Sequence, residues 1–180
     1  MKDFLNFPDG AYPFLLAADK AFKQTCRLET YMASGPGGQK RNRTLSAVRA
    51  VHIQTGISAI AEESRSQQEN RKRALKRVRK MIALYVRKDF FSGVVIHSSV
   101  ADLFSENRFG KINSGNPRYP LFCAVILDAL YMAKGKIGEA AKFLNISTGR
   151  LNRAVSADKE LLTAVNRLRN DFGLKALRPA

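Results

Sequence analysis

Cysteine and histidine, the residues that build disulfide frameworks and zinc sites, are scarce in this sequence. Of 180 residues, only Cys26 and Cys123 are cysteine and only His52 and His97 are histidine. The two cysteines lie far apart and lack CxxC spacing, so two buried thiols in a reducing compartment account for them. We therefore expect neither a metal site nor a cofactor.

Long hydrophobic runs are also missing. No stretch approaches the roughly 18 apolar residues of a membrane-spanning helix, and residues 1–10 lack the apolar core of a signal peptide. We expect no membrane partner. The start of the chain is not rich in Arg and Ser like a mitochondrial transit peptide, so the bacterial cytoplasm is favoured over a mitochondrial location.

Acidic residues are few compared with basic ones. Lys and Arg number 31 against 15 Asp and Glu, which gives a net charge of +16 and a pI of about 10.3. Such a surplus says little about the fold, but it indicates a polyanionic partner, most often nucleic acid.

Apolar periodicity divides the chain into a mixed part and a helical part. In the mixed part, the predicted order of elements is α-β-α-β-β-α, with a glycine-rich loop after the first strand. The expected elements are a helix over 12–25, a strand over 27–32, a short helix from Asn42 or Thr44 to Arg49, strands over 51–53 and 57–61, and a helix from about 68 to 86. This pattern predicts a compact α+β domain over 1–88, a linker over 89–120 and a small all-α helical domain over 121–180.

The long helix expected near residue 70 carries an unusual charge run. Seven of the ten residues from Arg71 to Lys80 are basic and none is acidic. An ordinary solvated helix face interleaves acids that form i,i+4 pairs, whereas like charges this dense repel one another. The run therefore favours an anionic partner.

The segment 33–39, Ala-Ser-Gly-Pro-Gly-Gly-Gln, cannot lie inside a helix or a central strand. Gly37 and Gly38 leave the backbone bare, so another molecule can approach its N–H groups closely. Gln39 adds one uncharged amide that both donates and accepts. No carboxylate, histidine or cysteine lies beside this loop to act as a base or nucleophile, so chemistry here would depend on positioning and oriented dipoles.

Four separate blocks around this loop occur in one order: 33–42, 46–49, 52–57, and 65–67 with 70–71. Together they resemble the catalytic domain of class I peptide chain release factors, across residues 12–87. The resemblance implies that Gly37, Gly38 and Gln39 enter the peptidyl transferase centre of the large ribosomal subunit, where water hydrolyses the P-site peptidyl-tRNA ester. The backbone N–H of Gln39 would stabilise developing oxygen charge and its side chain would place the water. In that family a glutamine methyltransferase often modifies this residue, which makes it an expected partner at Gln39.

The resemblance also implies a set of contacts to large-subunit rRNA by residues of the loop and the long helix. Lys40 and Arg43 depart from the family's usual residues but keep positive charge, so we expect tuning rather than loss. Arg65, with Ser66 and Gln67, matches an Arg-Ser-Gln block that either holds the loop base or contacts rRNA. The predicted rRNA-binding residues are Lys40, Arg41, Arg43, Arg65, Arg71, Arg73, Arg77 and Lys80.

Ordinary release factors carry a codon-reading domain, for which this sequence offers no room. Only about 11 residues precede the first predicted helix. The chain is thus similar to short, codon-independent members that release nascent peptide from stalled ribosomes. The expected protein is a monomeric peptidyl-tRNA hydrolase that acts only on the ribosome. A non-catalytic ribosome- or RNA-binding relative is the alternative from another class.

The second half of the chain resembles a helix-turn-helix unit of the Fis type over residues 135–147. Asn145 suits a tight turn between helices, and Ser147 or Thr148 can cap the helix that follows. The candidate nucleic-acid-binding residues on that helix are Arg150, Asn152 and Arg153. A small helical cap with its charges in solvent explains the pattern equally well, and a DNA-binding regulator is a further alternative.

Overall fold

The computed structural model describes residues 4–32, 45–88, 96–105 and 107–178. The chain divides into two compact units. Unit 1 comprises Met1–Tyr12 and Ala83–Ala180, and unit 2 comprises Pro13–Ile82. This division differs from the expected boundary after residue 88, because the first twelve residues group with the second half of the chain.

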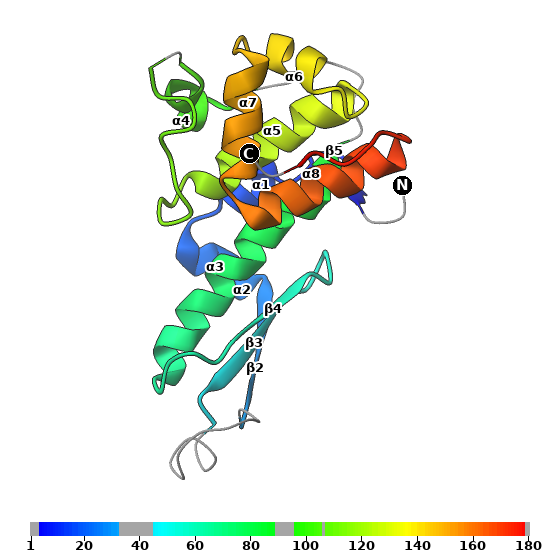
Figure 1. The fold of residues 1–180 in the computed structure, drawn as a ribbon. Helices are drawn as coiled ribbons and strands as arrows, with labels where there is room; N and C mark the ends of the chain where they lie inside the picture. The colour runs from blue at the N-terminus through cyan, green and yellow to red at the C-terminus, as the bar shows by residue number, and fades with distance from the viewer. Residues whose placement is uncertain (1–3, 33–44, 89–95, 106, 179–180) are drawn as a thin grey trace. The chain divides into compact units, whose positions relative to one another are not determined.

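Unit 2 is built on a three-stranded antiparallel sheet in the order β2-β3-β4 (Figure 1). The strands are β2 (Cys26–Tyr31), β3 (Ala47–His52) and β4 (Ser58–Ala61). At one end of the β2–β3 pair Tyr31 lies opposite Ala47, and at the other end Cys26 lies opposite His52. Both ends of the segment 32–46, which contains the glycine-rich loop, are therefore fixed side by side.

The order of elements in unit 2 differs from the predicted one. Two short helices, α1 (Tyr12–Leu16) and α2 (Asp19–Gln24), precede β2, and α3 (Gln67–Tyr85) follows β4. The prediction of a short helix ending at Arg49 was wrong, because residues 47–49 belong to β3; its predicted start at Asn42 or Thr44 lies outside the described residues. Val48, Ala50 and His52 are buried while Arg49 is exposed, which is the period-2 alternation of a strand paired on both sides.

One face of α3 is apolar and fully buried. Ala74, Val78 and Ile82 recur every four residues and have no exposed surface, and hydrogen bonds from α3 reach Ser46 and Ile60 beside the strands. In Figure 1, α3 runs alongside the sheet. The long helix predicted from this stripe is confirmed within one residue at each end.

His52 lies in the core of unit 2. Its ring makes an edge contact with Phe14 at 4.7 Å and stacks on Phe22 at 5.8 Å between centroids. Nδ1 is 2.9 Å from the Thr55 hydroxyl, while Nε2 is buried without a hydrogen-bond partner among the described residues. Burial lowers the pKa of His52, because the charged imidazolium loses its hydration there.

The lowered pKa of His52 predicts a pH-dependent stability. Above the ordinary histidine pKa of about 6.5, the ring is neutral in both the folded and the unfolded chain, and the free energy of unfolding is not reduced by protonation. As the pH falls below that value, the unfolded chain takes up a proton that the native state refuses, so the free energy of unfolding decreases. The slope from this group is at most about 1.4 kcal/mol per pH unit. Urea denaturation between pH 7 and 5 measures it, and His52→Phe should remove that part; an unchanged slope in the variant contradicts the assignment.

Unit 1 contains a central helix, α5 (Tyr119–Met132), whose residues from Tyr119 to Leu130 are all buried. Helices α6 (Ile137–Phe143), α7 (Thr148–Ser156) and α8 (Lys159–Asp171) are arranged around it in Figure 1. A short parallel pair, β1 (Leu5–Phe7) with β5 (Val86–Lys88), belongs to the same unit. Unit 1 is therefore not purely helical, although its described elements after residue 118 are all helices.

The segment expected to be a linker contributes to the core of unit 1. It contains α4 (Ser98–Ala101) and a 3-10 helix, η2 (Asp102–Phe104). Phe104, Phe109 and Phe122 form a ring cluster with centroids 5.2 to 5.6 Å apart. Residues 89–95 of the expected linker lie outside the described residues.

Arg87 of β5 is fully buried and forms an ion pair with the buried Asp128 of α5. The Arg87 Nη1 to Asp128 Oδ1 distance is 2.6 Å, and the same nitrogen donates to the carbonyl oxygen of Ala124 at 3.2 Å. The Tyr12 hydroxyl donates to the other carboxylate oxygen at 2.9 Å. Burial beside this carboxylate raises the pKa of Tyr12, so the phenol keeps its proton. These contacts join three segments that are distant in the sequence.

Removing one charge of this pair should be costly. Asp128→Asn leaves the Arg87 guanidinium buried without a counter-charge, and we expect a loss of about 3–5 kcal/mol in the free energy of unfolding. Urea denaturation followed by circular dichroism measures it.

The control for this substitution is Glu139→Gln. It breaks the exposed Lys142–Glu139 pair, with an N to O distance of 2.9 Å, and should cost no more than about 1 kcal/mol. Equal losses in the two variants would show that the Arg87–Asp128 pair is not desolvated.

Candidate functional site

The glycine-rich loop itself, including Gly37, Gly38 and Gln39, lies outside the described residues, and so do Lys40, Arg41 and Arg43. The structure describes the two places where this segment joins the sheet. Tyr31 and Ala47, the last and first strand residues on either side, are paired across β2 and β3. Leu45 and Ser46 precede β3 and form the loop base on that side.

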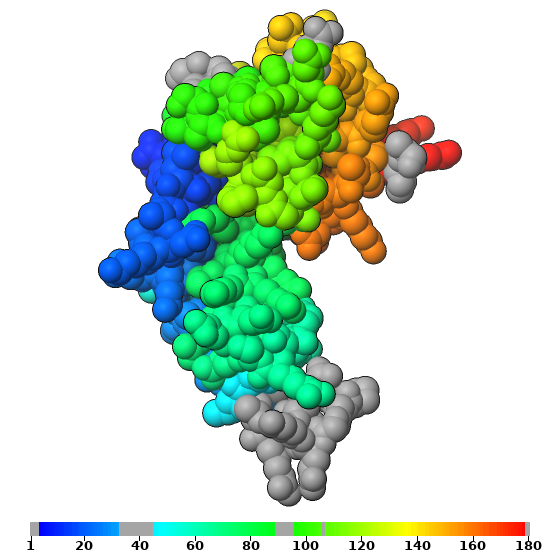
Figure 2. Space-filling model, turned by 90° about the vertical axis from the view of Figure 1, so that its left-hand side faces the viewer, coloured from blue at the N-terminus to red at the C-terminus, as the bar shows by residue number. Residues whose placement is uncertain are grey.

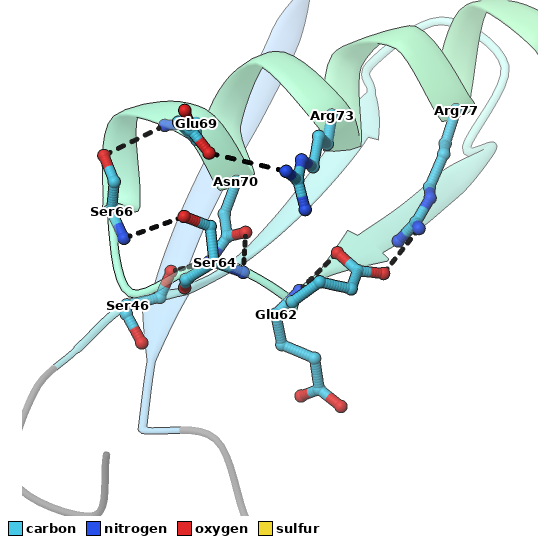
Figure 3. A network of polar contacts seen from close by, with 9 residues as sticks. Ser46, Glu62, Ser64, Ser66, Glu69, Asn70, Arg73 and Arg77 are labelled. Atoms are coloured by element: carbon cyan, nitrogen blue, oxygen red, sulfur yellow. Dashed lines mark hydrogen bonds and ion pairs between the residues drawn. The ribbon is translucent and has the colours of Figure 1, made fainter. Parts of the chain in front are cut away.

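Asn70, in the first turns of α3, holds the loop base by its side-chain amide (Figure 3). Nδ2 donates to the carbonyl oxygen of Ser46 at 2.7 Å and to that of Ser64 at 2.8 Å. Oδ1 accepts from the backbone N–H of Ser64 at 3.0 Å. Since Asn70 has no exposed surface, these bonds are not open to competition from water. One buried amide thus joins α3, the chain before α3 and the loop base.

Gln67 adds a second contact of the same kind. Its Nε2 donates to the carbonyl oxygen of Leu45 at 2.8 Å. Beside it, the hydroxyl of Ser66 accepts from the backbone N–H of Glu69 at 3.4 Å and caps the start of the helix (Figure 3). Within the Arg-Ser-Gln block, Gln67 therefore contacts the loop base and Ser66 caps α3. Arg65 is exposed.

Two arginines of the charge run on α3 are held by acids of unit 2. Arg73 is 3.4 Å from Glu69, one turn earlier. Arg77 is 2.5 Å from Glu63 and donates to the carbonyl oxygen of Ile60 in β4. The hydrogen bond from Arg77 lowers the pKa of Glu63. These guanidinium groups keep further N–H donors that can reach an external anion.

Arg79 is held by contacts within unit 2. It donates to Asp19 at 2.7 Å and to the carbonyl oxygen of Ala17 at 2.9 Å, and its guanidinium lies 4.3 Å from the centroid of the Phe22 ring. Arg71 and Lys80 are half-buried. The charge run therefore divides into residues that hold unit 2 together and residues that face solvent.

The lysines at 72 and 76 are the outermost cations of α3, and we did not include them among the predicted contacts. Both are exposed, and no hydrogen bond or ion pair involves them within the described part of the chain. In Figure 2, α3, coloured blue-green to green, forms much of the visible surface of unit 2. Helix phase could have identified them, because Lys72 and Lys76 lie opposite the buried stripe of Ala74 and Val78.

The candidate residues of the second half lie on α7 in unit 1. Asn145, between α6 and α7, adopts a left-handed conformation with φ of +52°, and the Ser147 hydroxyl accepts from the N–H of Arg150. Leu151 and Val155 are buried. Arg153 is exposed and Arg150 and Asn152 are half-buried, so the three candidates are at or near the surface of α7.

The described groups of this region can donate and accept hydrogen bonds and can attract an anion. No cluster of three or more potential metal ligands occurs among the described residues, and none of the described helices is long and apolar enough to span a membrane. The loop base offers neutral amides and hydroxyls, and the outer face of α3 offers cations.

Comparison with known proteins finds sequence similarity to one family over part of the chain. Residues 20–90 match the family model of the RF-1 domain. Peptide chain release factor 1 of Ureaplasma parvum serovar 3 is 57% identical over 53 residues, which cover 29% of this chain and 15% of that protein. Peptide chain release factor 2 of Paramagnetospirillum magneticum is 57% identical over 49 residues, 27% of this chain and 13% of that protein. For peptide chain release factor 1 of Streptococcus thermophilus the values are 51% over 57 residues, 32% and 16%.

Residues 20–90 of this chain are therefore similar to the RF-1 domain, and the matched relatives are peptide chain release factors. The chain spans less than a fifth of the length of the curated relatives that it matches.

Proposed function

We propose that this protein is a ribosome-dependent, codon-independent peptidyl-tRNA hydrolase that releases nascent peptide from stalled ribosomes. The observation that carries the proposal is the sequence Gly37-Gly38-Gln39 between the paired ends of β2 and β3, inside a release-factor domain. The paired strand ends and the amide contacts at Leu45 and Ser46 support a loop that is presented from a fixed base.

In the proposed reaction, water attacks the ester carbonyl of the P-site peptidyl-tRNA. A C–O bond to the water oxygen forms, the bond to the tRNA ribose oxygen breaks, and that oxygen takes a proton. The backbone N–H of Gln39 donates to the developing oxyanion, and the side-chain amide positions the water. Gly37 and Gly38 allow the close approach, and the ribosome supplies the remaining groups.

The cations of unit 2 are proposed to bind phosphates of large-subunit rRNA. Lys72 and Lys76 join the predicted set because they are exposed. Arg73 and Arg77 can serve both their acidic partners and a phosphate, since a guanidinium has five N–H donors. Such contacts are sequence-independent and depend on salt.

The codon-independent part of the proposal rests on the sequence resemblance to short, codon-independent members of the family. Most of unit 1 lies outside residues 20–90, the part that matches the RF-1 domain. We further propose bacterial cytoplasm as the site of action, because the matched relatives are bacterial release factors. We also propose that the protein is a monomer and that a glutamine methyltransferase modifies Gln39.

Unit 1 is proposed to contact RNA of the stalled ribosome through α7. The left-handed Asn145 and the cap at Ser147 set α7 at a sharp turn from α6, as in helix-turn-helix units. Helix α7 contains no acidic residue and carries Arg150, Asn152 and Arg153.

The loop is tested by release of labelled peptide from ribosomes stalled without a stop codon. Gly38→Ala should reduce the rate about 100-fold or more, because a Cβ at the tip obstructs close approach and displaces an oxyanion donor. Gln39→Ala should cost less, about 10-fold, since it keeps the backbone N–H. The matched control is Gln54→Ala, at an exposed turn of the same unit, which should release like the wild type. Equal release by all four proteins would remove the catalytic claim.

The role of α7 is tested by the double variant Arg150→Gln with Arg153→Gln. We expect weaker binding to stalled ribosomes and a salt dependence of log K reduced by about 1–2, one unit for each lost phosphate contact. Lys111→Gln with Lys175→Gln removes two exposed charges of the same unit and is the matched control. If the two double variants bind stalled ribosomes equally, α7 has no role in binding and is part of a structural cap. If the α7 variant loses only DNA binding, the DNA-binding regulator is favoured.

A further inference from the structure

We propose that Gln67 and Asn70 are positioning residues that hold Leu45 and Ser46, the base of the glycine-rich loop, in one orientation. This inference rests on the proposed function. Neither side chain belongs to the loop, and neither carries a charge that could contact rRNA phosphate. Both reach the loop base from the first turns of α3.

The two contacts act on consecutive backbone carbonyls. Gln67 donates to the oxygen of Leu45 at 2.8 Å and Asn70 donates to that of Ser46 at 2.7 Å. The donors are three residues apart on α3, so they lie on one face of a rigid helix. Immediately afterwards Ala47 enters the ladder with Tyr31. Holding two successive carbonyls fixes the orientation of the two peptide planes that follow Leu45 and Ser46.

The geometry at Asn70 admits only one arrangement of its amide. Both Nδ2 protons are used, by Ser46 and Ser64, and Oδ1 accepts from Ser64. The side chain is completely buried, so a rotated amide would turn Oδ1 toward two carbonyl oxygens. Asn70 therefore defines the position of Ser46 relative to α3.

Gln67 is better suited than Asn70 to a mutational test of the positioning role. It is half-buried, and its bond to Leu45 lies at the surface, where water can replace a lost donor. Its removal should therefore change stability little. What water cannot replace is the constraint on the direction of the Leu45 carbonyl. A misplacement of about 1 Å at a reacting group can cost up to 100-fold in rate.

Two adjacent glutamines on α3 provide a matched experiment. Gln67→Glu keeps the size of the side chain but replaces the donor by a carboxylate oxygen, which repels the Leu45 carbonyl. Gln68→Glu adds the same charge one residue away, at an exposed position without a contact among the described residues. Both variants and the wild type are tested in peptide release from stalled ribosomes, with kcat and KM for ribosomes measured separately.

We expect Gln67→Glu to lower kcat about 10-fold, with a KM equal to that of Gln68→Glu, since both carry the same added charge. Gln68→Glu should keep the wild-type kcat. Gln67→Lys, which restores a donor, should recover kcat to within about 3-fold of Gln68→Lys. In the free proteins, backbone amides of Ser46 and Ala47 should exchange hydrogen faster in Gln67→Glu than in Gln68→Glu, while the urea midpoints stay similar.

The outcomes separate the two claims. If the wild type releases peptide and Gln67→Glu has the same kcat as Gln68→Glu, the positioning role is overturned and the proposed function stands. A change in KM alone would also overturn it, because that result indicates a contact with the ribosome. If the wild type releases nothing beyond Gly38→Ala, the proposed function fails and the positioning role falls with it. If Gln67→Glu lowers kcat and Gln67→Lys restores it, the positioning role is supported.

Discussion

One buried amide, that of Asn70, holds together the parts of unit 2 on which the candidate site depends. It joins α3 to the chain before the helix and to Ser46 at the loop base. The group is neutral, so its burial requires hydrogen bonds but no counter-charge. The strand pairing of Tyr31 with Ala47 and the contact from Gln67 complete the base. The mechanism proposed for the loop depends on positioning and would need such a base, because no side chain is proposed to act as a base or nucleophile.

The charge run of α3 shows how one helix can serve a fold and a surface together. Arginines at the flanks of the buried stripe reach acids and backbone carbonyls of unit 2, as Arg77 does with Glu63 and Arg79 with Asp19. Lysines opposite the stripe, at 72 and 76, remain exposed. Planar guanidinium groups with several donors suit the first role, and compact ammonium groups on flexible stems suit the second.

The candidate site remains a prediction from local features of the sequence, because its loop lies outside the described residues. Gly37, Gly38 and Gln39 are adjacent, and the stripe of Ala74 and Val78 is periodic within one helix, so neither needs a partner to be recognised. The sequence did not decide between two roles for the Arg-Ser-Gln block, loop anchoring and rRNA contact. The structure shows the contact between Gln67 and Leu45. Residue identity alone does not tell which way an amide points.

The sequence by itself determined the glycine-rich segment, the long basic helix and the helices after residue 120, because each follows from neighbouring residues. Tertiary structure alone decided that residues near Arg49 form a strand, since strand pairing with β2 overrides local capping signals. It also decided that Tyr12 contacts Asp128, which pairs with Arg87, and that Phe104 and Phe109 of the expected linker are buried. Each of these outcomes depends on residues far apart in the chain, and contacts of that kind leave no periodic trace in a sequence.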